Sequence, residues 1–462
     1  MSVSNPLPRI PARIVWRAVW VPLLLALVTF AALVLYQHRP SNITLDPNQR
    51  FQTFRAWEAT LETPPGLTPK PYRVSVYESL IRDVGITRVR LEVYAGAEGR
   101  NGIALRDYYA GRTDMSGWRL WRYTTINDDA DPFHINTAGF DFFDVDSRME
   151  LGALPMLQAA KAQGRSLDLL LTYVAFTGQN QGAAYLHTEP EEYAEFVLAT
   201  FLHLKEKYGV VPDSFEPLLE PDLAGNWTPD SFGKAIGAAV TRLSENGFHP
   251  RIVAPSVSNI FRADDWLEGI AKTEVAQKAI SEISYHRYYG GPERVLTDLA
   301  QRAARIGAQT SMLEYWFGKA THDLLYEDLT MANVSAWQGR SDYTYHVIES
   351  DGSFALAPDI RLNRLYMQAI RPGAIRIAAE GGRRNRVRAT AFLTPEGRIN
   401  LILDSLKGGT ARIKNLAPGY YVMDEAYVGL PDRPQSAVTV PASGKISLSM
   451  PGEGVLTLRA LP

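Results

Sequence analysis

Hydrophobic and polar positions follow two alternating patterns between residues 51 and 371. Apolar runs of strand length, such as 166–176, alternate with longer stretches in which apolar residues recur at the helical period, such as 190–209. The first pattern is typical of buried strands and the second of amphipathic helices. Strands that alternate with helices predict a parallel sheet whose strands are joined by right-handed crossovers.

The number of these strands predicts a closed (β/α)8 barrel, because about eight strands can be counted and eight such units close into a TIM barrel. The expected strands are 51–59, 85–94, 166–176, 213–219, 251–256, 280–285, 310–315 and 334–337. The expected helices are 141–164, 190–209, 229–246, 264–272, 292–306 and 326–333. An open doubly wound sheet is the alternative, but it usually carries a glycine-rich turn after its first strand, and none is evident here.

The pattern changes at about residue 372. Short alternating runs such as "INLILDS" and "GVLTLRAL" are separated by Gly, Pro, Asp and Asn from there to residue 462. This pattern predicts an antiparallel β-domain, a sandwich. The polar stretch 37–50 is expected to be a linker that contains one short strand, "ITL".

An uncharged apolar run occupies residues 18–36, and Arg9, Arg13 and Arg17 precede it. A run of this length can cross a bilayer as a helix, and basic residues favour the cytoplasmic side. The pattern predicts a cytoplasmic tail over 1–17, a single transmembrane anchor over 18–36, and a periplasmic or extracellular location for the rest. A cleaved signal peptide is the alternative, although its apolar region is usually shorter and no small-x-small cleavage site follows the run.

Composition narrows the class of protein. The chain has 462 residues, of which 46% are hydrophobic and 21% charged, which is enough for one large domain and a smaller one. The net charge of −2 gives no indication of nucleic-acid binding. The absence of cysteine excludes disulfides, thiolate metal sites and a cysteine nucleophile.

The ends of the expected strands carry the candidate chemistry, because the active site of such a barrel gathers there. These ends carry Arg90, Glu220, His286, Tyr288, Glu314 and Trp337. Hydrolysis of a glycosidic bond needs one carboxylic acid to protonate the leaving oxygen and one carboxylate to attack or stabilise the sugar carbon. Carboxyl groups roughly 5 Å apart permit a covalent intermediate and retention of configuration. This chemistry needs no metal or organic cofactor.

Each candidate also has a structural interpretation. Glu220 could end a strand and face solvent, and Glu314 could be one half of a structural ion pair. The side chains that could equally belong to the core are Arg90, Tyr173, His286 and Trp337. Trp227 is expected to be exposed on the loop after the fourth strand, where an aromatic face can stack on a sugar.

Some other charged positions could join the site or contact a glycan, but they are expected to be solvated. They are Glu58, Glu92, Asp222 and the basic turn 381–388. The acidic loop 127–132 does not have the spacing of an EF-hand, and no metal site is expected there.

Several motifs, taken together in their order and spacing, resemble a known family from residue 43 to the C-terminus. "PLLEPD", "ISYHRYYG", "SMLEYW" and "VSAWQG" resemble the strand-four, strand-six, strand-seven and strand-eight motifs of glycoside hydrolase clan A. "ITLDPNQRFQTFRAWEAT" and "YMQAIRPGAIRI" resemble the start of the barrel and the join to the β-sandwich in family 30 of that clan. The resemblance implies a barrel and a sandwich into which the N-terminal strand docks.

The resemblance also implies roles for single residues. Glu220 would be the acid/base and Glu314 the nucleophile. Tyr288 would hydrogen-bond the nucleophile, while Arg90, His286 and Trp337 would line the sugar subsite.

Three positions depart from the family pattern. Leu219 stands where the clan usually has an asparagine that contacts the sugar 2-hydroxyl. "RAWEA" replaces a "GFG" turn, which places Trp57 and Glu58 near the expected floor of the pocket. Tyr173 is the nearest residue to a tryptophan expected after the third strand. The family's substrate therefore does not transfer to this chain.

These patterns together predict a membrane-anchored, retaining glycoside hydrolase that acts outside the cytoplasm on a polysaccharide or oligosaccharide. Its expected partners are the carbohydrate substrate and the membrane, with no nucleic acid. Two alternatives stay open. One is a carbohydrate-binding protein that has lost catalysis on the same fold, and the other is a transglycosylase that uses the same glutamates.

Overall fold

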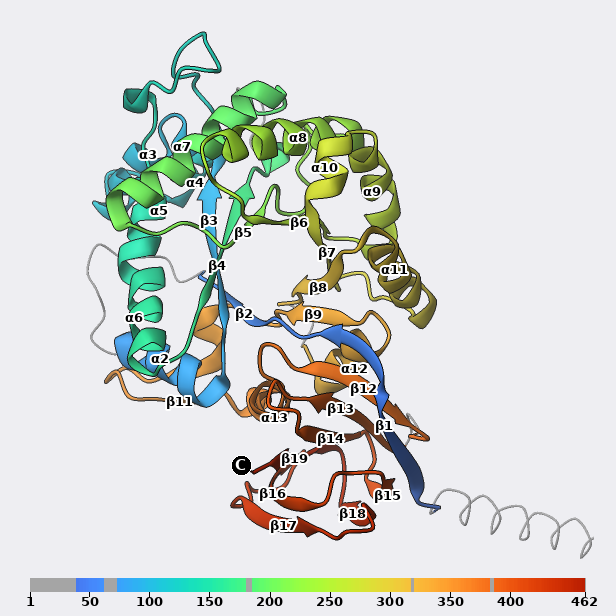
Figure 1. Cartoon of the computed structure of the whole chain (residues 1–462). Helices are drawn as coiled ribbons and strands as arrows, with labels where there is room; N and C mark the ends of the chain where they lie inside the picture. Colours follow the sequence, from blue (N-terminus) through green and yellow to red (C-terminus); the bar gives the residue numbers. More distant parts are fainter. Residues whose placement is uncertain (1–38, 62–72, 180–184, 317–319, 383–385, 462) are drawn as a thin grey trace, which may run out of the picture.

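The computed structural model describes residues 39–61, 73–179, 185–316, 320–382 and 386–461, which form a barrel above a curved sheet (Figure 1). The expected cytoplasmic tail and membrane anchor lie outside the described residues. Within the described ranges, no helix has the length and apolar character that a membrane crossing requires.

The barrel is closed and has the parallel strand order that the sequence predicts. Neighbouring strands follow one another in chain order, and β2 pairs with β9 to close the ring. Its strands are β2 (Ala56–Thr60), β3 (Arg88–Tyr94), β4 (Asp168–Val174), β5 (Ser214–Glu216), β6 (Arg251–Val257), β7 (Ile280–His286), β8 (Gln309–Glu314) and β9 (Val334–Trp337). The predicted (β/α)8 barrel is therefore confirmed.

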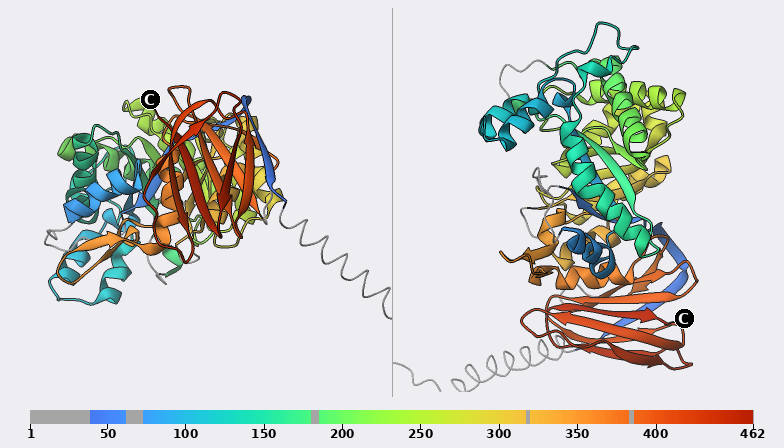
Figure 2. Two further views of the ribbon diagram at one scale, coloured as in Figure 1. Left: turned by 90° about the horizontal axis from the view of Figure 1, so that it is seen from below. Right: turned by 90° about the vertical axis from the view of Figure 1, so that its left-hand side faces the viewer.

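Helices surround the barrel (Figures 1 and 2). They are α2 (Arg73–Ser79), α3 (Asn101–Tyr109), α4 (Met115–Arg122), α5 (Phe143–Arg148), α6 (Leu154–Ala162), α7 (Pro190–Tyr208), α8 (Pro229–Glu245), α9 (Ala263–Ala271), α10 (Glu274–Ala279), α11 (Glu293–Ile306), α12 (His322–Thr330) and α13 (Arg361–Ala369). Local signals set some of their ends. The Thr228 side chain accepts a hydrogen bond from the Ser231 backbone at the start of α8, and Gly209 ends α7 in the left-handed conformation.

The predicted first strand, 51–59, is wrong in its extent. Residues up to Thr53 belong to β1 (Ser41–Thr53), and the barrel strand begins only at Ala56. The reason is tertiary pairing: Thr53 still lies opposite Ile375 of the second domain, so the chain leaves one sheet before it joins the other.

The second domain is a nine-stranded sheet in which only β1 and β15 pair in parallel. Its order is β17-β16-β19-β14-β13-β12-β1-β15-β18. Besides β1, its strands are β12 (Ile375–Glu380), β13 (Val387–Leu393), β14 (Ile399–Ser405), β15 (Gly409–Lys414), β16 (Gly419–Tyr427), β17 (Ser436–Val440), β18 (Ile446–Met450) and β19 (Gly454–Ala460). All of these strands contribute to one apolar cluster, as expected of a sheet that curls around its own core. The antiparallel β-domain is confirmed, and its strands form one continuous sheet. A small hairpin of β10 (His346–Ile348) and β11 (Phe354–Leu356) precedes it.

A buried carboxylate joins the sheet to the barrel helices. Asp404 of β14 lies 2.7 Å from Nδ1 of His322 on α12 and accepts hydrogen bonds from the Tyr366 hydroxyl at 2.8 Å and from Arg388 Nε at 2.9 Å. Arg388 was expected in a solvated turn, but it is buried on β13, where its guanidinium pairs with Asp404 of the neighbouring strand and, across this interface, with Asp323 of α12.

Charged side chains fill the barrel interior. Arg88, Arg90 and Glu92 occupy alternate positions of β3, and alternate residues of a strand face the same side. Arg88 pairs with Glu58 of β2 and with Glu282 of β7, whose Oε1 lies 2.8 Å from Nη1. Buried charges are costly unless they are paired, so these side chains are held in the interior as ion pairs.

Candidate active site

The structure brings Glu220 and Glu314 together at the C-terminal mouth of the barrel. Glu220 lies in the loop after β5, and Glu314 is the last residue of β8. With His286, the last residue of β7, they form a trio whose potential ligand atoms all lie within 4.8 Å of one another. Two carboxylates that are distant in the sequence therefore face each other across a short gap.

Both oxygens of Glu314 receive hydrogen bonds. Nη2 of Arg90 lies 2.5 Å from Oε2, and the Tyr288 hydroxyl donates to Oε1 at 2.7 Å. Burial raises the pKa of Tyr288, and the negative charge of Glu314 raises it further. Burial alone would lower the pKa of Arg90, but the carboxylates of Glu314 and Glu216 outweigh burial and raise it. Both groups therefore remain donors to Glu314.

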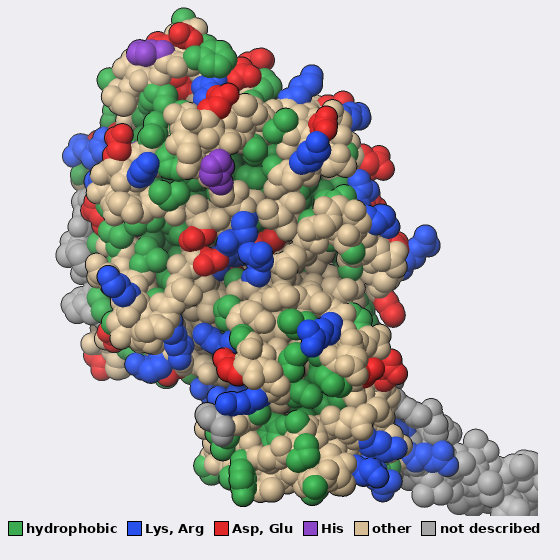
Figure 3. All heavy atoms as spheres, viewed as in Figure 1, with side chains coloured by type: hydrophobic (Ala, Val, Ile, Leu, Met, Phe, Trp, Pro, Cys, Tyr) green, Lys and Arg blue, Asp and Glu red, His purple; other side chains and the backbone are tan. Residues whose placement is uncertain are grey.

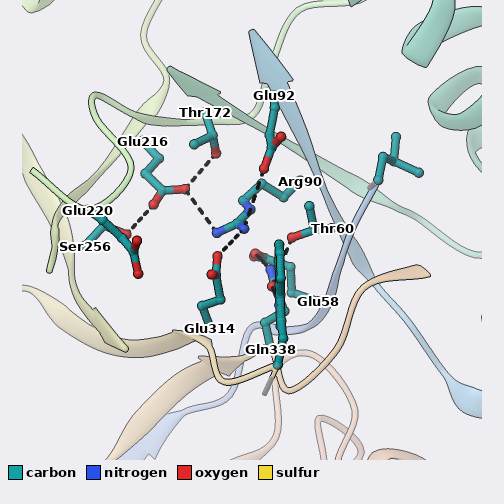
Figure 4. Close-up of polar contacts among 12 residues, drawn as sticks. Glu58, Thr60, Arg90, Glu92, Thr172, Glu216, Glu220, Ser256, Glu314 and Gln338 are labelled. Atoms are coloured by element: carbon teal, nitrogen blue, oxygen red, sulfur yellow. Dashed lines mark hydrogen bonds and ion pairs between the residues drawn. The ribbon is translucent and has the colours of Figure 1, made fainter. Parts of the chain in front are cut away.

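Arg90 lies at the centre of the site (Figure 4). Its guanidinium is fully buried and also lies 3.8 Å from Glu92 and 3.9 Å from Glu216. One cation thus pairs with three carboxylates, which lie on β3, β5 and β8.

Glu220 has a different environment. Its Oε1 lies 2.8 Å from Nδ1 of His286, and its side chain is almost fully buried. The backbone of Glu220 has φ 48°, and that of Ser256 has φ 56°. Both values lie in the left-handed region that non-glycine residues rarely adopt, and such strain concentrates at functional sites. The Glu220 amide donates to the Ser256 carbonyl at 3.1 Å, so the two strained residues support each other.

A third glutamate lies beneath this pair and was not among the sequence candidates. Glu216, at the end of β5, is fully buried and accepts hydrogen bonds from Thr172 Oγ1 at 2.6 Å and from the Ser256 hydroxyl. The signal that could have found it is its register. On a strand that faces the barrel interior, Glu216 sits among apolar neighbours where a purely structural barrel would carry a branched apolar residue.

The trio could also hold a metal ion. In the part of the chain that the structure describes, Glu220, His286 and Glu314 are the one group of three His, Asp or Glu side chains close enough to share an ion. The Arg90 guanidinium already pairs with Glu314 there, so the protein itself supplies a positive charge at this position.

The other sequence candidates lie in the walls of the barrel. Trp337 is buried, and its indole N–H donates to Asp328 Oδ2 at 3.0 Å. Tyr173 is fully buried, and its hydroxyl lies 2.6 Å from Nδ1 of His187. Trp57 is also fully buried, and its indole N–H donates to the Ile370 carbonyl at 2.7 Å.

Trp227 is not the exposed platform that its loop position predicts. The ring is only 7% exposed, and its N–H donates to the Tyr185 hydroxyl at 2.9 Å. It directly precedes the N-cap of α8 and packs edge-on against Phe232, with the ring centroids 6.0 Å apart. A hydrophobic contact across a helix start is a common staple of helix N-termini, which explains why this ring is buried.

Glu58 and Glu92 are buried rather than solvated, which corrects the sequence expectation. Glu58 is fully buried in the barrel, where Arg88 pairs with it and Gln338 Nε2 donates to it at 2.5 Å. Burial by itself raises the pKa of Glu92, but Arg148 and Arg90 outweigh burial and lower it.

Asp222 and Leu219 flank the acid/base candidate. Asp222 is half-buried and accepts hydrogen bonds from the amides of Ser258 at 2.8 Å and Asn259 at 3.0 Å. Leu219 packs in a small apolar cluster with Tyr94, Tyr123, Val174 and Phe176. The position where the resemblance expects an amide is therefore part of an apolar wall.

Comparisons with known proteins were made at the level of sequence and of structure. Neither a protein-family model nor a curated protein sequence matches the chain. Solved structures match at low identity. The catalytic domain of family 30 xylanase C from Talaromyces cellulolyticus is similar at a TM-score of 0.64 and 14% identity, over 91% of this chain and 100% of that one.

Two further structures agree with this likeness. A family 30 endoxylanase from Clostridium papyrosolvens has a TM-score of 0.64 and 16% identity, over 90% of this chain and 99% of that one. An endo-β-1,6-glucanase has the same TM-score, 0.64, and 16% identity, over 92% and 95% of the two chains. The chain therefore has the fold of family 30 glycoside hydrolases, at a sequence distance that leaves its activity to be argued from its own residues.

Proposed function

We propose that the protein is a membrane-anchored, retaining glycoside hydrolase that acts on a polysaccharide or oligosaccharide outside the cytoplasm. The observation that carries this proposal is the pair of facing carboxylates, whose nearest oxygens lie within 4.8 Å. Retaining enzymes hold their two carboxyl groups about 5–5.5 Å apart, whereas inverting enzymes leave about 6.5–9.5 Å for a water molecule. The separation in this site favours retention.

The two glutamates receive different roles because their neighbours differ. Arg90 and Tyr288 donate to Glu314, which suits a carboxylate that attacks the anomeric carbon. Glu220 is bonded through one oxygen to His286, which leaves the other oxygen free to serve the leaving group. Arg90, His286 and Tyr288 thus act as direct neighbours of the catalytic pair, while Tyr173, Trp227 and Trp337 support the wall around it.

The reaction would proceed in two displacements. Glu314 forms a bond to the anomeric carbon as the glycosidic carbon–oxygen bond breaks, and Glu220 gives its proton to the departing oxygen. Glu220 then takes a proton from water, whose oxygen attacks the same carbon and releases Glu314. The developing positive charge on the sugar ring forms beside the Glu314 carboxylate, which stabilises it.

The substrate class is supported by two observations. The similar structures are named as xylanases and a glucanase, which act on polysaccharides. On the face of the molecule in Figure 3, acidic and basic side chains are interspersed over the barrel, and no broad single-sign patch is present to attract a polyanion.

The N-terminal apolar run supports the proposed location. The described chain begins just before β1, a strand of the nine-stranded sheet, so an anchor over 18–36 would tether the protein through that sheet. In cell fractionation, the protein should therefore sediment with the membranes. In cells whose outer envelope has been made permeable, added protease should cut the chain after residue 38. Recovery of the full chain in the cytosolic fraction would contradict this location.

The test of the activity uses the full chain and a panel of aryl glycosides and bacterial glycans. Glu220→Gln and Glu314→Gln are each expected to lower hydrolysis at least about 100-fold, because each removes a group that acts in the transition state. Glu293→Gln, at an exposed position on α11, is the matched control. Unchanged hydrolysis in either active-site variant would reject the assignment. Glycan binding without turnover would favour the binding protein, and transfer to a sugar acceptor the transglycosylase.

A further inference from the structure

A chain of hydrogen bonds leads from Glu216 to Glu220 beneath the floor of the site. The Ser256 hydroxyl donates to Glu216, and its Oγ lies 3.2 Å from Nε2 of His286. The other ring nitrogen, Nδ1, lies 2.8 Å from Oε1 of Glu220. Glu216, Ser256 and His286 are each 0% exposed, so water does not compete for these contacts. Figure 4 shows Glu216, Ser256 and Glu220 along this path.

The chemistry of the groups sets the direction of each hydrogen. A carboxylate can only accept, so Ser256 gives its hydrogen to Glu216 and its oxygen must accept from His286. Nε2 of His286 must therefore carry a hydrogen. At 2.8 Å, a bare Nδ1 and a carboxylate oxygen of Glu220 would repel each other, so that contact requires one more proton. The Glu220–His286 pair holds this proton jointly.

The charges around His286 favour keeping that proton. The ring faces Glu220 and Glu314, lies beside Tyr288 with the ring centroids 6.0 Å apart, and has the Arg90 cation nearby. Burial by itself lowers the pKa of His286, but Glu314 and Glu220 outweigh burial and Arg90 and raise it.

Glu216 is held in its accepting role from two further sides. Thr172 Oγ1 donates to its Oε2 at 2.6 Å, and Nη1 of Arg90 lies 3.9 Å from the same oxygen. These contacts hold the Glu216 side chain in place independently of the branch that leads to His286.

We propose that Glu216 is a positioning residue for the general-acid step. Acting through Ser256, it fixes a hydrogen on Nε2 of His286, so that the proton shared by Nδ1 and Glu220 is available to the leaving oxygen. This inference rests on the proposed glycosidase function. Glu220 gives the shared proton to the glycosidic oxygen as the carbon–oxygen bond breaks and regains one from the attacking water, while His286 keeps its Nε2 hydrogen throughout.

The kinetic test is Glu216→Gln in the full chain. The glutamine amide can donate to Ser256, whose hydroxyl then turns toward Nε2, and the histidine hydrogen moves to Nδ1. Glu220 then accepts from Nδ1 and has no proton to give. For an aryl glycoside with a weakly acidic leaving group, kcat/KM should fall about 10–100-fold, and the high-pH limb of its profile should move to lower pH. A 2,4-dinitrophenyl glycoside, whose leaving group needs no proton, should change by less than about threefold.

Two matched variants separate this role from a structural one. Ser256→Ala breaks the same chain of hydrogen bonds. It should likewise lower kcat/KM for the weakly acidic leaving group much more than for the 2,4-dinitrophenyl glycoside. Thr172→Val removes the other hydroxyl on Glu216 with little change of shape, and it should keep the leaving-group dependence of the wild type. Equal losses on both substrates in Glu216→Gln would mean that Glu216 only supports the structure, and would overturn the inference.

A measurement that does not depend on activity locates the hydrogen itself. Nitrogen NMR of the histidine-labelled full chain, with the His286 signal assigned through its loss in His286→Gln, should show hydrogen on Nε2 in the wild type and its loss there in Glu216→Gln. If the wild-type His286 ring carries no hydrogen on Nε2, or if the ring is unchanged in Glu216→Gln, the role of Glu216 is overturned and the proposed function is unaffected. Failure of the wild type to hydrolyse any glycoside would instead overturn the proposed function and, with it, the acid role.

Discussion

At the scale of single residues, the site depends on one buried cation, Arg90, and on the hydroxyl donor that also binds Glu314. Arg90 contacts Glu314 at 2.5 Å, and Tyr288, just after the neighbouring strand β7, donates the second hydrogen bond to that carboxylate. Glu220 and Glu314 could be predicted from the sequence because each ends a short apolar run, where a charge is conspicuous. Glu216 was missed: its register among apolar residues is a sequence signal, but its contacts with Thr172 and Ser256 depend on which strands flank β5, and that pairing is not visible in local sequence.

The Tyr288 hydroxyl gives a direct prediction at this scale. Tyr288→Phe removes a hydrogen bond to a charged group, worth about 1.5–3 kcal/mol, and should lower kcat about 10–100-fold if that bond strengthens in the transition state. Steady-state kinetics on the best aryl glycoside measures the effect. Tyr289→Phe is the control, since that neighbouring ring is 57% exposed. A Tyr288→Phe enzyme as active as the control would show that Glu314 does not need this donor.

At the scale of elements, the barrel strands and the long helices could be predicted from their regular hydrophobic periods. Elements that depend on contacts with other segments could not be predicted in this way. Helices α3 and α4 lie in a stretch rich in glycine and arginine and were not predicted. They form because Trp118 of α4 donates to the Asn101 side chain of α3 at 2.8 Å, and Asp114 caps the second helix. The Trp118–Asn101 contact appears only once the chain has folded, so propensity alone does not reveal it, whereas the Asp114 cap is a local signal.

His346 of the hairpin strand β10 gives a pH-dependent prediction at this scale. Its Nε2 lies 2.9 Å from Ser79 Oγ of α2, and burial lowers its pKa to about 4. An unfolded histidine has a pKa of about 6.5, so the unfolded state binds more protons between these values, and stability is lost as the pH falls through that window.

The expected loss is about 2 kcal/mol by about pH 4.5. Urea unfolding of wild type and His346→Gln at several pH values measures it, and the difference between the two proteins should shrink as the pH falls from 6.5 toward 4. A difference that does not vary with pH would show that His346 takes up its proton without cost in the folded protein.

At the scale of the whole molecule, the barrel and the sheet are joined by buried charges as well as by apolar packing. The N-terminal strand β1 enters the sheet before the chain builds the barrel, and α12 and α13 pack against β14. Figure 2 shows the two parts stacked along one axis. The barrel and the β-domain could be predicted separately from their two periods, whereas the Asp404 contacts that hold them together could not, because they join residues far apart in the sequence.

Asp404 provides the prediction at this scale. Asp404→Ala leaves Arg388 and His322 without their shared buried partner, and removal of one member of a buried ion pair costs about 3–5 kcal/mol. Denaturant unfolding should show this loss for the whole chain. Asp432→Asn breaks an ion pair whose carboxylate is 72% exposed, and it should cost less than about 1 kcal/mol. Equal stability of the two variants would show that the interface does not depend on Asp404.

The measurement that bears most directly on the central claim is the configuration of the first sugar released. Proton NMR of an aryl glycoside during hydrolysis by the full chain records which anomer appears before mutarotation. Two carboxylates within 4.8 Å predict that the first product has the same anomeric configuration as the substrate. First release of the opposite anomer would contradict the double displacement at Glu314.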